Sequence, residues 1–64
     1  MMMKVFHAGD RVKLDSELLQ YSANKHWIGK IGTVKNICGS YCRVKWDHLE
    51  KTSLEPQDYI EKVY

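Results

Sequence analysis

The sequence contains only two cysteines among its 64 residues and no apolar run long enough to cross a membrane. Two cysteines are too few for a disulfide framework, and a reducing compartment would keep both as thiols. The first ten residues, MMMKVFHAGD, include one lysine but no apolar stretch long enough for a signal peptide. We therefore expect a cytoplasmic protein with two free thiols and no membrane contact.

The chain is also short, which leaves little room for a catalytic pocket. A domain of this size buries only about 60% of the surface that its unfolded chain exposes. A nucleophilic Cys/His pair would need a third orienting group and a cleft, and the sequence indicates neither. We expect a single domain over residues 1–64, with no enzymatic activity, no catalytic residue and no cofactor.

Charge is distributed unevenly along an otherwise ordinary composition. The chain is 44% hydrophobic and 28% charged, as is usual for a soluble domain. Residues 1–46 contain eight Lys/Arg against three Asp/Glu, whereas residues 47–64 contain two against five. This predicts a basic face and an acidic edge if the basic side chains converge in the fold. The alternative is a chance fluctuation of the kind that small domains often show.

Alternation of apolar and polar residues predicts β-strands. Residues 11–14 and 41–47 alternate with a period of two, which is typical of half-buried strands. The side chains expected in the core are Val12, Leu14, Cys42, Val44 and Trp46. Those expected on the outer surface are Arg11, Lys13, Tyr41, Arg43, Lys45 and Asp47. Further strands are predicted within 27–37, at 51–54 and at 59–63, and a long loop is predicted from 15 to 28.

Two glycines three residues apart stand out in the segment 29–34, GKIGTV. A phosphate-binding glycine loop requires a following helix, whose N-terminal amides hold the anion. Residues 33–37 predict a strand instead, so we do not expect a phosphate cradle. Gly32 is predicted to allow a β-bulge or a sharp bend, either of which would let Ile31 and Val34 both point inward.

The order of these signals resembles an SH3-like barrel. Two segments, Gly9-Asp10-Arg11-Val12 and Gly29-Lys30-Ile31-Gly32-Thr33-Val34, are similar to the KOW module of ribosomal proteins and transcription elongation factors. The segment Pro56-Gln57-Asp58-Tyr59 is similar to the ending of peptide-binding SH3 domains, in which the Pro and Tyr line the groove for proline-rich ligands. We therefore expect an all-β, five-stranded SH3-like barrel. It would have a long loop after the first strand and a short 3-10 turn before the last.

Basic residues with an aromatic neighbour predict nucleic-acid binding. The predicted interface consists of Arg11, Lys13, Lys30, Lys35, Arg43, Lys45 and Tyr41. Lys and Arg neutralise phosphates, and Tyr41 or Trp27 would stack on a base. Binding of DNA or RNA would be mainly electrostatic and weakly selective for sequence. The alternatives are a solvated face that keeps the protein soluble and a surface for an acidic protein partner.

An aromatic groove is the second candidate site. It would be lined by Tyr21, Trp27, Pro56 and Tyr59. Such a groove suits a polyproline peptide, a methylated lysine or an unstacked base. The alternative function is therefore a peptide- or protein-binding adaptor, which could come from a virus or a mobile element. Trp27 could equally close one end of the barrel. The sequence predicts neither the identity of the partner nor the oligomeric state.

A zinc site is not expected. Cys38 and Cys42 have a spacing that a zinc half-site allows, but the second half would need paired ligands. His26 and His48 are isolated from each other in the sequence. The two cysteines are better explained as small buried thiols.

Overall fold

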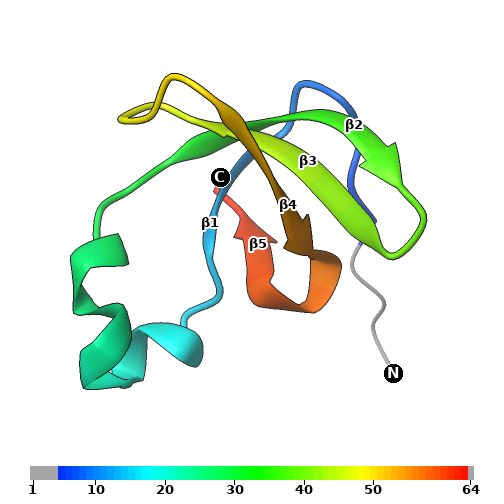
Figure 1. The fold of residues 1–64 in the computed structure, drawn as a ribbon. Coiled ribbons are helices and arrows are strands. Elements are labelled where there is room, and N and C mark those ends of the chain that lie inside the picture. Colours follow the sequence, from blue (N-terminus) through cyan, green and yellow to red (C-terminus); the bar gives the residue numbers. More distant parts are fainter. Residues whose placement is uncertain (1–4, 64) are drawn as a thin grey trace.

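The computed structural model describes residues 5–63 and consists of five strands and three short 3-10 helices (Figure 1). In chain order these are β1 (Arg11–Leu14), η1 (Leu18–Gln20), η2 (Ser22–Trp27), β2 (Gly32–Cys38), β3 (Tyr41–Trp46), β4 (Thr52–Pro56), η3 (Gln57–Tyr59) and β5 (Ile60–Lys62). Within this part of the chain, none of the helices has the length and apolar character needed to span a membrane.

All five strands form one antiparallel sheet in the order β4-β3-β2-β1-β5. β1 has a partner on both sides, because Val12 pairs with Gly32 of β2 and with Lys62 of β5. The sheet is curled (Figure 1), but no pairing joins β4 to β5 within residues 5–63. The prediction of an all-β fold is therefore confirmed, and the sheet is open.

The core lies on the face of the sheet to which the alternating strands direct their apolar residues. It contains Phe6, Val12, Leu14, Val34, Cys42, Val44, Trp46 and Ile60. The predicted inner positions of β1 and β3 are all among them. Each large side chain that is fully buried contributes about 1.5–3 kcal/mol relative to its exposed state. The burial of these few residues therefore supplies most of the driving force for folding.

The prediction of a β-bulge at Gly32 was wrong. The register of β2 against β3 shifts between Val34 and Asn36, so Lys35 is the extra residue. Gly32 instead lies in regular pairing opposite Trp46. A Cβ atom on Gly32 would stand 2.6 Å from Cγ1 of Val44 and 3.0 Å from Cε3 of Trp46. Glycine is required there because the facing side chains fill the space, and not because of a bulge.

The long segment between β1 and β2 has local structure of its own. Within the segment, Asn24 Nδ2 donates a hydrogen bond to the Leu18 carbonyl at 2.9 Å. The amide of Asp15 connects the segment to η3 by donating to the Tyr59 carbonyl at 2.8 Å. Trp27, at the end of η2, packs against the core with its ring centroid 4.9 Å from that of Trp46. The predicted long loop is thus present and is anchored at both ends.

Candidate nucleic-acid interface

Strand register places most of the predicted basic residues on one face of the sheet. Arg11 pairs with Thr33 of β2, and Thr33 pairs with Lys45 of β3. Residues directly opposite each other across an antiparallel pair project to the same side. Arg43 and Lys13 share that side because they lie two residues from Lys45 and Arg11. We call this surface, opposite the core, the outer face.

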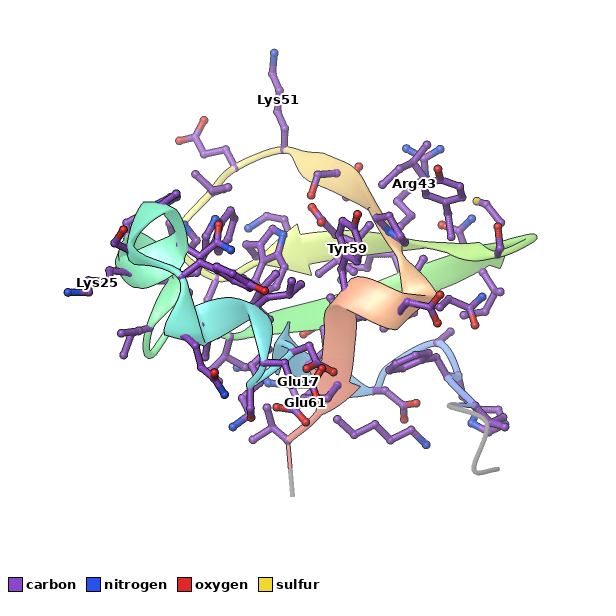
Figure 2. The ribbon with its side chains drawn as sticks, turned by 90° about the horizontal axis from the view of Figure 1, so that it is seen from below. Glu17, Lys25, Arg43, Lys51, Tyr59 and Glu61 are labelled. Carbon is purple, nitrogen blue, oxygen red and sulfur yellow. The ribbon has the colours of Figure 1, made fainter. Side chains whose placement is uncertain are left out.

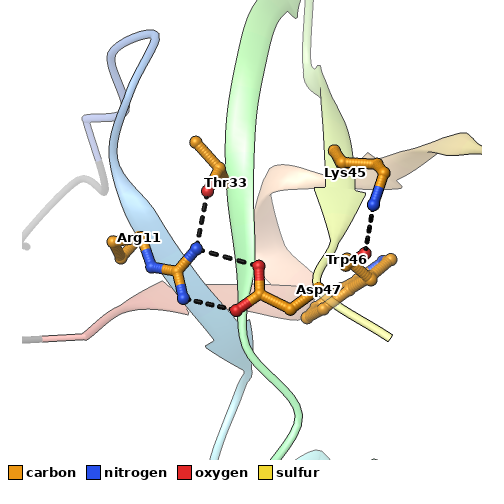
Figure 3. A network of polar contacts seen from close by, with 5 residues as sticks. All are labelled: Arg11, Thr33, Lys45, Trp46 and Asp47. Atoms are coloured by element: carbon orange, nitrogen blue, oxygen red, sulfur yellow. Dashed lines mark hydrogen bonds and ion pairs between the residues drawn. The ribbon is translucent and has the colours of Figure 1, made fainter. Parts of the chain in front are cut away.

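Arg11 is held by a carboxylate that follows β3 (Figure 3). Its Nη1 donates to Thr33 Oγ1 at 2.8 Å and to Asp47 Oδ1 at 2.9 Å, while its Nη2 donates to Asp47 Oδ2. The hydrogen bonds with Asp47 raise the pKa of Arg11. The same hydrogen bonds are the main cause of the lowered pKa of Asp47. The positive charges of Arg11 and Lys45 lower that pKa further, by a smaller amount. The charge of Arg11 is therefore already largely balanced.

The cations near β5 are also paired with carboxylates. Lys13 Nζ lies 3.7 Å from Glu61 Oε1. The same oxygen accepts a hydrogen bond from the backbone amide of Ser16 at 2.9 Å. Lys62 Nζ lies 3.5 Å from Asp10 Oδ2. The pKa of Asp10 is lowered, chiefly by a hydrogen bond from the His7 amide at 2.7 Å and then by Lys62. The β1–β5 side of the sheet thus offers little unbalanced positive charge.

The β2–β3 side of the described region differs, because its cations form no ion pair. Lys35 and Arg43 are exposed and form no ion pair within residues 5–63. Lys45 Nζ donates to the carbonyl of Trp46 at 3.0 Å. Tyr41, on the same face of β3, is 45% exposed. We call Lys35, Arg43, Lys45 and Tyr41 the β2–β3 basic surface.

Lys30 does not lie on the strand where it was expected. β2 begins only at Gly32, because the chain turns before it: Gly29 has a φ of +80° and the amide of Lys30 donates to the Trp27 carbonyl at 3.1 Å. Lys30 is half-buried in this turn. It is therefore not part of the outer face that strand pairing defines.

The four residues of the predicted aromatic groove lie in different parts of the fold: Tyr21 between η1 and η2, Trp27 in η2, Pro56 in β4 and Tyr59 in η3. Trp27 is half-buried and its ring contacts those of Trp46 and His26 in tilted geometry and that of His48 edge-on, at centroid distances of 4.9, 5.4 and 5.6 Å. Pro56 pairs with Tyr41, so it lies at the other end of β3 from Trp46, roughly 17 Å along the strand. The remaining two, Tyr21 and Tyr59, are 63% and 51% exposed.

Sequence patterns missed the acidic partners of the outer face and the histidines around Trp27. Strand parity placed Asp47 on the outer surface with Lys45, but its contact with Arg11 joins residues 36 positions apart, which local alternation does not reveal. Glu61 likewise meets Lys13 only through the β1–β5 pairing. Leu54 was predicted within a strand at 51–54, but its position opposite Arg43 depends on the register between β3 and β4.

The cysteines and histidines form no recognisable centre. Cys42 is buried, Cys38 is half-buried, and both are free thiols. Within residues 5–63 no three or more His, Cys, Asp or Glu side chains converge as metal ligands would. In the described region, the charged side chains of the outer face are therefore the candidate binding groups.

Comparisons with protein-family models, with curated proteins and with solved structures find no match to this chain.

Proposed function

We propose that this protein is a cytoplasmic, non-enzymatic module with an SH3-like barrel fold, which binds nucleic acid through the β2–β3 basic surface. The observation that carries the proposal is the difference between the two sides of the outer face. Arg11 and Lys13 face Asp47 and Glu61, whereas Lys35 and Arg43 have no such partner within residues 5–63. Exposed cations that lie in no ion pair attract phosphates.

The fold part of the proposal rests on connectivity. The curled antiparallel sheet has a long segment between β1 and β2 and a 3-10 turn, η3, before β5. Both are features that we expected of this chain as an SH3-like barrel. β4 and β5 are separated only by the three residues of η3, so the two edges of the sheet begin close together. A barrel needs only these edges to approach along their remaining length.

Binding would be mainly electrostatic. Each cation that contacts a phosphate releases condensed counterions, and the slope of log K against log salt is about −0.7 per contact on a single strand. Three contacts, by Lys35, Arg43 and Lys45, give a slope of about −2. Affinity would then fall roughly twentyfold between about 50 and 200 mM salt. Phosphate contacts position a ligand without reading its bases, so sequence selectivity would be weak.

The direct test is a fluorescence anisotropy titration of labelled oligonucleotides at several salt concentrations. We expect saturable binding of DNA or RNA at low salt with the slope given above. A proline-rich peptide and a polyglutamate peptide serve as competitors. Absence of oligonucleotide binding at low salt would overturn the proposal. Equal competition by polyglutamate would indicate a site for acidic proteins, and salt-independent binding of the proline-rich peptide would favour the adaptor function.

A further inference from the structure

The shape of the described region is unsuited to reading duplex DNA. The major groove of B-DNA admits an α-helix or a two-stranded β-ribbon. Residues 5–63 contain no α-helix, and the longest 3-10 helix, η2, has six residues. The β2–β3 hairpin is not a free ribbon, because β4 pairs with β3 from Lys45–Thr52 to Tyr41–Pro56. Each added strand widens the ribbon by about 4.8 Å. The three strands therefore present a broad surface and not an edge that enters a groove.

One end of this surface combines an exposed ring with a cation and an apolar side chain. Tyr41 is 45% exposed and lies on the same face as Arg43, about 6.6 Å along β3. Leu54, 50% exposed, pairs directly with Arg43 from the neighbouring strand, and Pro56 pairs with Tyr41. Figure 2 shows Arg43 on the side of the molecule remote from η1 and η2, and it has no ion pair within residues 5–63.

These neighbours have the chemistry of a stacking site. An exposed aromatic ring offers a π-face to any base, and single-strand binding proteins use such rings beside positive charge. Arg43 could contact a phosphate next to the stacked base, while Leu54 and Pro56 provide apolar cover beside the ring. A base can reach a ring that lies on a sheet surface only when it is unpaired and turned out of a helix.

We propose that Tyr41, Arg43 and Leu54 form a subsite for one unpaired base, so that the protein selects single-stranded over double-stranded nucleic acid. The proposal rests on the nucleic-acid binding inferred above and specifies its substrate class. The base stacks on Tyr41 and the adjoining phosphate binds Arg43. Trp27 takes no part, because its ring packs against Trp46 at the other end of β3.

The experiment compares a labelled oligo(dT) strand with a duplex of the same length by fluorescence anisotropy at low salt. We expect the single strand to bind at least about tenfold more tightly. Tyr41→Leu removes the ring and should weaken single-strand binding by about tenfold, within the range known for base–aromatic stacking. Because no charge is lost, the salt slope should stay unchanged. Tyr41→Phe keeps the ring and should bind like the wild type.

Tyr59→Leu is the matched control, since Tyr59 on η3 is similarly exposed, and it should leave affinity unchanged. A second test uses the wild-type protein alone: in NMR spectra, the ring protons of Tyr41 should shift upfield when the single strand is added. If wild-type protein binds no oligonucleotide, the proposed function itself is wrong. If it binds strand and duplex equally, or if Tyr41→Leu matches the wild type, binding stands but the subsite is wrong. An equal loss in Tyr41→Phe or in Tyr59→Leu would also overturn the subsite.

Discussion

Gly32 and Trp46 face each other across β2 and β3 so closely that Gly32 has no room for a side chain. Trp46 is fully buried, and the ring of Trp27 packs against it at a centroid distance of 4.9 Å. Its indole Nε1 donates to Ser53 Oγ at 3.2 Å. The ring therefore cannot move away without breaking a hydrogen bond or the core.

Replacing Gly32 should be strongly destabilising. The added methyl group of Gly32→Ala would collide with Val44 and Trp46, and overpacking of this kind costs typically about 1–3 kcal/mol. We expect the free energy of unfolding, measured by urea denaturation, to fall by about 2 kcal/mol. Gly39→Asn is the control, because Gly39 lies in an open turn at φ +61°, a conformation that Asn tolerates. Equal stability of Gly32→Ala and wild type would contradict the packing argument.

Two pairs of charge removals should affect oligonucleotide binding differently. Arg43→Ala with Lys45→Ala removes two cations of the β2–β3 basic surface and should flatten the salt slope by about 1.4 on a single strand. Lys25→Ala with Lys51→Ala removes the same total charge, but these side chains point away from Arg43 in other directions (Figure 2). The second pair should lower affinity only slightly and leave the slope unchanged. Identical slopes for the two double variants would mean that only net charge attracts the ligand.

Stability should depend on pH through Asp10 and Asp47. The pKa of each is lowered in the folded protein, chiefly by a hydrogen bond from the His7 amide to Asp10 and from Arg11 to Asp47. A lowered pKa means that the folded state holds the proton less tightly than the unfolded state. The stability gained is complete above the unfolded pKa of about 4 and is lost as the pH falls through it toward the folded value.

We therefore expect the melting temperature to be nearly constant above about pH 5 and to fall below about pH 4. Asp47→Asn should reduce this fall, since the group no longer titrates. Glu50→Gln, an exposed substitution in the turn after β3, should follow the wild-type curve. An Asp47→Asn profile identical to that of the wild type would show that the Arg11 contact is absent in solution.

The two thiols should differ in reactivity. Burial raises the pKa of Cys42, and only the thiolate reacts with alkylating reagents. Cys38 is half-buried near the β2–β3 turn. Brief treatment of the native protein with iodoacetamide should add one group, and treatment after unfolding should add two, as judged by mass spectrometry. Cys38→Ser should leave the native protein unlabelled. Labelling of both cysteines at equal rates in the native state would contradict the burial of Cys42.

Local alternation predicted the inner face of β1 and β3 because the two-residue period is a property of the strand itself. The charge balance of the outer face depends on which strands become neighbours, so it could not be predicted this way. Arg11 and Asp47 meet only because β2 lies between β1 and β3. Similarly, the sequence pattern singled out Gly32, but the need for glycine there comes from its pairing with Trp46. Trp27 follows a segment without periodicity, so its place over the core depends on tertiary packing.

The pairing of β1 with β5 also constrains the order in which the chain can fold. β2, β3 and β4 join through successive hairpins, whose ends meet after short loop closures. By contrast, Val12 must find Lys62, 50 residues away, and closing so long a loop is entropically costly. The three-stranded meander of β2, β3 and β4 should therefore form first. β1 should gain its second partner strand only when β5 pairs with it.

During synthesis, the native sheet cannot be completed until Lys62 has left the ribosome. Until then Val12 and Leu14 stay partly uncovered, and this is the stage at which self-association is most favoured.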